Sequence, residues 1–217
     1  MLLRCEAAWH PFGHVPDAAK GLDHVASIVI LTGSPGTGKT TVGARLAQAM
    51  PRGLHIPSDV FYTFPAHPIS PYRPPALQQN TDIIAAVTRT SATFADRGYD
   101  VVLDGIFGPH FLPVMAGELA ATDLPVYYVV LQAPLDVALR RVQDRIGHEK
   151  DHVVRLMHAV FSDLGPYATH TVETGSRDAD TVATELRELI DRGRFTLDLS
   201  RVATAVMPGA PNPHGVA

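Results

Sequence analysis

The 217-residue chain has a single cysteine, Cys5, so neither an internal disulfide nor a metal site built from several thiolates is available to it. It has no apolar run near the ~20 residues that a membrane-spanning helix requires. Residues 1–9 also lack the apolar stretch of a signal peptide. A net charge of −4 provides no general positive surface for nucleic acid or membranes. We therefore expect a cytoplasmic protein that binds neither.

A glycine-rich run, GSPGTGKT, spans residues 33–40 and matches the phosphate-binding pattern G-x-x-x-x-G-K-[ST] at every fixed position. The apolar residues 28–31 before it predict a buried strand, and apolar residues at helical spacing in 41–50 predict a helix. In such a loop, backbone N–H groups point at phosphate oxygens, the lysine adds a charge, and the hydroxyl after it suits Mg²⁺. The sequence therefore predicts a site for ATP and Mg²⁺. The expected binding residues in this run are Gly33, Ser34, Pro35, Gly36, Thr37, Gly38, Lys39, Thr40 and Thr41.

Strand-like and helix-like segments alternate along the rest of the chain. Further strands are expected at 53–57, 100–104, 126–131 and 168–172, and helices at 76–97, 110–121, 135–146, 152–164 and 179–191. Apolar strands that alternate with helices indicate a parallel sheet covered on both faces. We predict an α/β fold, a three-layer P-loop NTPase domain with a mainly parallel five-stranded sheet, over residues 25–200. Residues 1–24 are expected to form an N-terminal extension, and the Pro/Gly-rich residues 201–217 a flexible tail.

Acidic residues follow two of the predicted strands, at the edge of the sheet where ligands of such folds bind. Asp104 closes the strand 100–104 and is expected to hold Mg²⁺ through water, opposite Thr40. Asp59 comes just after the strand 53–57 and is expected to take the proton of an acceptor hydroxyl. For both aspartates, capping of a turn is the alternative.

The predicted helix 135–146 carries Arg141 and Arg145, which are one turn apart and therefore share a face. Guanidinium groups presented together suit the charge of a phosphoryl group in transfer, although a solvated arginine face has the same spacing. With Lys39 and Asp59, these two arginines are the expected catalytic residues.

Five prolines in residues 64–75 exclude regular structure there, so we expect this segment to shape an acceptor pocket. For the aromatic residues nearby, a place in the core is the alternative. The expected substrate-binding residues are Asp59, Phe61, Tyr62, Tyr72, Arg73, Asp104, Phe107 and His110.

With these motifs, the chain resembles small P-loop kinases that phosphorylate hydroxyl groups of metabolites or antibiotics. They include shikimate kinase-like and gluconate kinase-like enzymes, chloramphenicol phosphotransferase and the zeta-toxin group. The resemblance covers about residues 26–193. It rests on the P-loop and on four further stretches, namely SD at 58–59, VLDG at 102–105, PLDV at 134–137 before the two arginines, and ETGS at 173–176.

The resemblance implies a nucleoside-kinase-like fold with a small helical lid at about residues 140–160. It also implies that Asp59 is the base, that Arg141 and Arg145 belong to the lid over ATP, and that Thr174 lies near the adenine. One departure is that many relatives have an arginine shortly after the aspartate, where this chain has VFYT at 60–63.

The function implied is an ATP-dependent phosphotransferase acting on a hydroxyl of a small molecule, as a monomer or homodimer. A nucleoside or nucleotide acceptor is the alternative within this class, and an ATPase- or GTPase-type switch without an acceptor lies outside it. The switch is disfavoured because Asn80 and Asn212, the only asparagines, are not followed by the lysine of N-K-x-D.

One literal motif points elsewhere. His148 and His152 match H-E-x-x-H of zinc proteases, but the stretch between them is charged and begins just after Gly147. A ligand role for either histidine is left open.

Overall fold

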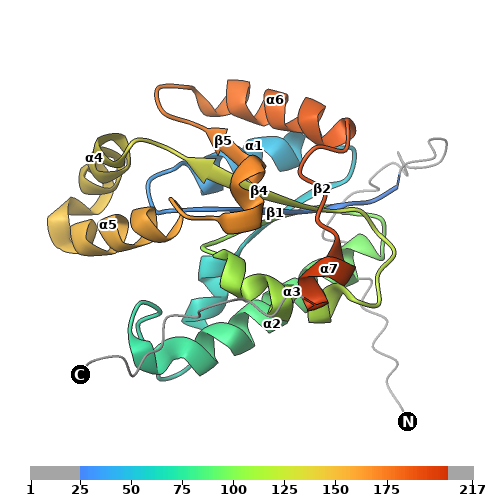
Figure 1. Cartoon of the computed structure of the whole chain (residues 1–217), viewed down its shortest axis with the longest axis horizontal. Coiled ribbons are helices and arrows are strands. Elements are labelled where there is room, and N and C mark those ends of the chain that lie inside the picture. The colour runs from blue at the N-terminus through green and yellow to red at the C-terminus, as the bar shows by residue number, and fades with distance from the viewer. Residues whose placement is uncertain (1–24, 205–217) are drawn as a thin grey trace, which may run out of the picture.

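A parallel β-sheet forms the centre of the computed structural model, which describes residues 25–204 (Figure 1). The expected extension at 1–24 and residues 205–217 of the expected tail lie outside the described residues. The strand order is β2-β3-β1-β4-β5, and every neighbouring pair is parallel, which confirms the predicted sheet. The strands are β1 (Ile28–Gly33), β2 (Gly53–Pro57), β3 (Asp100–Asp104), β4 (Val126–Gln132) and β5 (Thr171–Glu173).

Helices cover both faces of the sheet because its central strand is apolar on both sides. Successive side chains of a strand point to opposite faces, so Ile28 and Ile30 of β1 enter one core cluster and Val29 and Leu31 enter the other. The first face packs against α2 (Leu77–Ala95), α3 (Leu112–Leu119) and α7 (Leu199–Thr204), and the second against α1 (Lys39–Ala49) and α6 (Ala179–Asp191). Figure 1 shows these as the layers below and above the sheet.

Two helices stand apart from these layers, beyond the end of the sheet (Figure 1). They are α4 (Leu135–Ile146) and α5 (Asp151–Val160), joined by the 3₁₀ turn Gly147–Lys150. Ala138, Leu139 and Val142 of α4 pack against Val154 of α5 in a small apolar cluster of their own. The pair therefore has less apolar support than the helices that flank the sheet.

The last strand lies further along the chain than its sequence predicts. Residues Gly165–His170 form a 3₁₀ turn, and β5 pairs with β4 only from Thr171 onward. The rings of Tyr167 and His170 pack against Tyr128, and His170 Nδ1 lies 2.8 Å from the carbonyl oxygen of Tyr128. Ring packing thus holds residues 168–170 in a turn, although their composition is typical of a strand. None of the described helices combines the length and apolar character that a bilayer crossing needs.

Candidate active site

The loop between β1 and α1 takes a shape that only glycine permits at two of its positions. Gly36 and Gly38 have φ of 85° and 90°, in the region that disfavours other residues. A side chain at Gly36 would also collide with α4, since a Cβ there would lie 2.3 Å from the carbonyl oxygen of Ala138. The loop therefore lies directly against α4, and α1 begins immediately after it at Lys39.

Lys39 is a buried cation at the start of α1, with 9% of its surface exposed. Its Nζ donates a hydrogen bond to the carbonyl oxygen of Ser34 at 3.0 Å. Burial lowers the pKa of Lys39 to about 8, although the carboxylates of Asp104 and Asp59 act in the opposite direction; Arg145 lowers it further. The neighbouring carboxylates thus only partly offset the cost of burying the Lys39 ammonium. A bound anion in front of the loop would offset more of it.

A cavity of about 410 Å³ opens in front of this loop, where the carboxyl ends of the parallel strands meet. It brings together residues from the loop, from the ends of β2 and β3, from α4 and from the turn after β5. Segments far apart in the sequence thus share one chamber. The expected site residues that line it are Pro35, Gly36, Thr37, Gly38, Lys39, Thr40, Thr41, Asp59, Tyr72, Asp104, Arg141, Arg145 and Thr174.

Thr40 and Asp104 present oxygen atoms to the same part of this cavity. Thr40 Oγ1 lies 3.4 Å from Asp104 Oδ1, and the other oxygen of Asp104 lies 2.7 Å from Nε2 of His55. One carboxylate beside one hydroxyl fits Mg²⁺, which keeps several waters and takes its remaining ligands from phosphates. Within residues 25–204 there is no cluster of three or more His, Cys, Asp or Glu side chains that could hold a metal without such help.

Arg141 connects the glycine loop with the turn after β5. Its Nη1 donates to the carbonyl oxygen of Gly36 at 3.2 Å, and its Nη2 donates to that of Gly175 at 2.7 Å. The hydroxyl of Thr174 lies 2.9 Å from the carbonyl oxygens of both Thr37 and Gln132. Three segments are thereby fastened around one side of the cavity.

The two predicted arginines share the cavity, whereas their neighbour on α4 does not. Arg145 lines it with Arg141. Arg140 points elsewhere and is exposed, 3.4 Å from Asp136. Arg141 is half-buried, whereas Arg145, like Arg140, is exposed.

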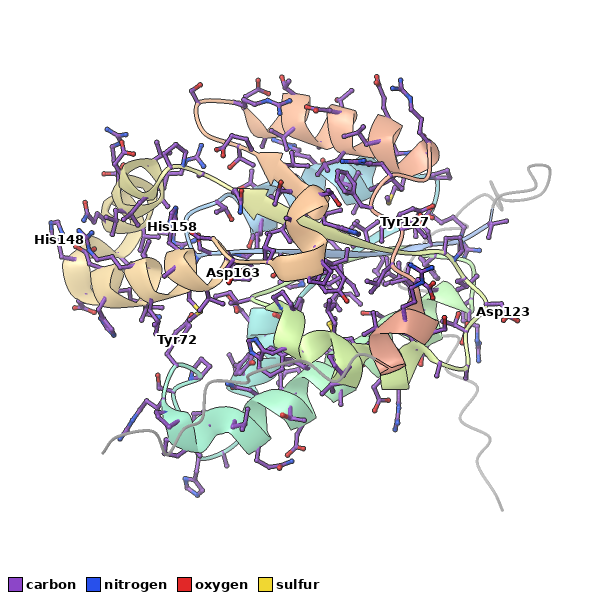
Figure 2. The ribbon with its side chains drawn as sticks, viewed as in Figure 1. Tyr72, Asp123, Tyr127, His148, His158 and Asp163 are labelled. Carbon is purple, nitrogen blue, oxygen red and sulfur yellow. The ribbon has the colours of Figure 1, made fainter. Side chains whose placement is uncertain are left out.

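Asp59 follows β2, at the opposite edge of the sheet from β5, and lies near two tyrosines. Burial raises the pKa of Tyr62 to about 12, with a smaller contribution from the nearby carboxylate of Asp59. Burial and then Asp59 also raise the pKa of Tyr72. Both phenols therefore keep their protons at neutral pH and are available as donors. Figure 2 shows Tyr72 projecting from the irregular segment before α2 toward α5.

Several expected site residues lie outside the cavity. Phe107 is 1% exposed and packs in the core, where its carbonyl oxygen accepts a hydrogen bond from the Tyr128 hydroxyl at 2.9 Å. Phe61 packs against the same core, while Arg73 is exposed. The remaining ones that do not line the cavity are Gly33, Ser34, Tyr62 and His110.

Three residues with ionisable side chains, in or beside the cavity, are absent from the expected site: His55, Lys150 and Arg177. Arg177 lines the cavity and pairs with Glu185 of α6, and its position directly after ETGS is the one signal the sequence offers. Lys150 belongs to the charged stretch between the two histidines of the H-E-x-x-H match. His148 itself lies in the exposed turn at the tip of α4 and α5, near Asp151 (Figure 2).

Comparison with known proteins agrees with this geometry. The family model described as an AAA domain matches residues 29–155, more than half of the chain, so the chain belongs to this AAA-domain family. A search of curated proteins gave no match.

Among solved structures, a sugar kinase from Janibacter is 16% identical, with a TM-score of 0.59, and the alignment covers 84% of this chain and 100% of that one. The tunicamycin resistance protein of Deinococcus radiodurans is 17% identical at a TM-score of 0.59, over 80% and 99% of the two chains. Shikimate kinase from Acinetobacter baumannii, in complex with shikimate, is 20% identical at 0.56, over 78% and 94%. The chain therefore has the fold of P-loop kinases.

Proposed function

We propose that this AAA-domain protein is an ATP-dependent phosphotransferase that moves the γ-phosphoryl group to a hydroxyl of a small molecule. The observation that carries the proposal is the position of Asp59, which lines the same cavity as Lys39 and Arg145. A carboxylate in the chamber of a phosphate-binding loop, on the side away from the turn after β5, suits an acceptor hydroxyl.

On the nucleotide side, the backbone N–H groups of residues 33–40 would hold the phosphates at the positive end of α1. Lys39 and Arg145 would neutralise the charge that grows on the transferring group. Arg141 would connect phosphate and adenine regions, because its guanidinium already reaches both the loop and the turn at 174–175.

Thr40 and Asp104 are the residues that would hold Mg²⁺, Asp104 through water. When bound, the ion would partly neutralise the charge of the outer phosphates. The chain itself supplies the orientation of the two oxygen donors, which come from α1 and β3.

On the acceptor side, Asp59 would take the proton of the acceptor hydroxyl. The hydroxyl oxygen would at the same time form the new bond to the γ-phosphorus. The bond from that phosphorus to the β–γ bridging oxygen breaks, and ADP leaves with the electron pair. Tyr62 and Tyr72, which remain protonated, would donate hydrogen bonds that orient Asp59 or the acceptor.

The end of α4 and the whole of α5, at about residues 140–160, would form a lid over this chamber. Arg141 and the close approach of Gly36 to Ala138 hold the middle of α4 against the loop, so the part that would move is α5, which contacts α4 through a small apolar cluster, with the turn before it (Figure 1). Closure would exclude water from the site, so that ATP is not hydrolysed before an acceptor arrives.

A panel of acceptors tests the proposal directly. ADP release is measured with ATP and Mg²⁺ alone, and then with sugars, hydroxylated acids, nucleosides and hydroxylated antibiotics, and products are checked by mass spectrometry for one added phosphoryl group. We expect a low basal rate and a large increase with one chemical class, with ADP and phosphorylated product formed in equal amounts. ATP hydrolysis at full rate that no acceptor changes would contradict it. A nucleoside as the sole active class would place the chain among nucleoside kinases.

A further inference from the structure

His55 occupies a position on β2 that its neighbours determine. Leu54 and Ile56 pack into the core on the side of α2 and α3, and alternation along a strand therefore turns His55 toward α1. Its register partner on β3 is Val102, and Pro57 is paired with Asp104. The side chain is 16% exposed, so the imidazole lies between the sheet and α1, out of bulk water.

A glycine of α1 makes room for this ring. A Cβ at Gly43 would lie 2.9 Å from Nε2 of His55, closer than a Cβ normally approaches, and 3.2 Å from Cδ2, which is also tight. Glycine inside a helix is less stable than alanine because it loses more backbone freedom on folding. Gly43 therefore leaves space for the imidazole although alanine at this position would make α1 more stable.

The two oxygens of the Asp104 carboxylate have different partners. Oδ2 lies 2.7 Å from Nε2 of His55, and Oδ1 lies 3.4 Å from the hydroxyl of Thr40. Because a carboxylate only accepts hydrogen bonds, Nε2 carries the proton and donates it. With one oxygen held in this way, the plane of the carboxylate is fixed and the other oxygen faces Thr40.

We propose that His55 is a positioning residue, which orients Asp104 so that Oδ1 faces Thr40 and the metal-binding edge of the cavity, and that Gly43 provides the space for its ring. The inference rests on the proposed function, since it takes Thr40 and Asp104 as the residues that hold Mg²⁺. Hydrogen-bonding partners behind metal ligands commonly change metal affinity by about 10- to 100-fold.

Calorimetric titration with a non-hydrolysable ATP analogue, in EDTA and over a series of Mg²⁺ concentrations, gives the Mg²⁺ concentration needed for half of the gain in affinity. His55→Leu removes the donor at similar volume and is expected to raise this concentration roughly 10-fold or more, with unchanged affinity in EDTA. His55→Gln can donate from a similar place and is expected to keep most of the wild-type Mg²⁺ dependence.

Gly43→Ala displaces the imidazole without changing it, and is expected to reproduce the effect of His55→Leu. It also keeps the test available if His55→Leu does not fold. Leu54→Ala is the matched control on the same strand: it removes core packing, so it lowers the melting temperature but leaves the Mg²⁺ dependence unchanged.

An unchanged Mg²⁺ dependence in His55→Leu, together with normal analogue binding, would overturn the inference and leave the proposed function standing. Equal losses in His55→Gln and His55→Leu would also overturn it, because the ring would then only fill space. If the wild-type protein does not bind the analogue, the proposed function fails first, and that outcome is distinguishable from the other two.

Discussion

The two sides of the cavity are built differently. On the nucleotide side, the glycine loop is bonded to α4 by Arg141 and to the turn after β5 by Thr174, and it joins directly to β1 and α1. On the acceptor side, residues 58–76 consist of 3₁₀ turns and proline-rich loop. Apart from bonds within the segment, its hydrogen bonds run to the start of α2, where Gln79 pairs with the backbone of Ile69 and Asn80 donates to the carbonyl oxygen of Pro71.

This difference separates a fixed half from an adaptable one. The phosphate-binding half is cross-linked by buried and half-buried hydrogen bonds and has its geometry before any ligand arrives. The acceptor half is local in its bonding and exposes apolar residues such as Phe64, which is 67% exposed. We therefore expect changes in the first half to affect nucleotide binding and transfer together, and changes in the second half to affect transfer alone.

Lys39→Ala is expected to have the largest effect. Loss of this charge removes stabilisation of the transferring phosphoryl group, and kcat/KM for ATP should fall roughly 1,000-fold. The melting temperature should not fall, because burial lowers the pKa of Lys39 and its charged form is therefore unfavourable in the free protein. Steady-state kinetics and thermal unfolding measure the two quantities.

Lys150→Ala is the matched control, since it removes another lysine of the cavity lining that is exposed. Its effect should be much smaller. Full activity in Lys39→Ala would remove the glycine loop from the proposed mechanism.

Asp59→Asn tests the acceptor half. The amide preserves the shape of the carboxylate but cannot take a proton, so the turnover number should fall about 100-fold or more. The affinity for an ATP analogue should stay at the wild-type value, since Asp59 follows β2 at one edge of the sheet and the loop-to-turn connection lies toward β5 at the other. Single-turnover transfer with an active acceptor and calorimetry with the analogue separate the two effects. An unchanged turnover number would exclude Asp59 as the base.

The fixed half of the cavity is also the half that the sequence predicts best. The loop motif and the apolar strands are local signals, and they were sufficient for the five-stranded parallel sheet and for the prediction that Lys39 and Asp104 lie at one edge of it. The spacing of Arg141 and Arg145 predicts a shared face, and both residues line the cavity, while their catalytic role stays a prediction.

What remained hidden depends on contacts between distant segments. The sequence around Phe107 cannot tell whether the ring enters the core or the cavity, and the core position follows from packing of β4 and α3 around it. Nothing near His55 predicts its bond to Asp104, because the two are 49 residues apart and meet through the register of β2 and β3. The start of β5 was misplaced because Tyr167 and His170 pack their rings on Tyr128.

Arg141→Ala should weaken the fixed half by an intermediate amount. It removes the charged hydrogen bonds to the carbonyl oxygens of Gly36 and Gly175, which connect loop and turn. The Kd for the ATP analogue should rise about 10-fold. Arg140→Ala, on the exposed face of the same helix, is the matched control and should leave the Kd unchanged, because an exposed ion pair contributes little. Equal effects of the two substitutions would mean that general positive charge on α4, rather than the connection made by Arg141, determines the affinity.

The smallest expected effect comes from pH, and it distinguishes a buried lysine from an exposed one. Burial lowers the pKa of Lys39 to about 8 in the free protein, and bound phosphates favour the charged form, so binding takes up a proton once the pH exceeds this value. Nucleotide affinity is then highest below pH 8 and falls as the pH rises, by about fourfold between pH 7 and 8.5. Calorimetry across this range measures the slope, with Lys39→Ala as the control that should lose it. A wild-type affinity that stays constant from pH 7 to 8.5 would mean that Lys39 is already charged throughout, and that the loop is less well shielded from water than its burial indicates.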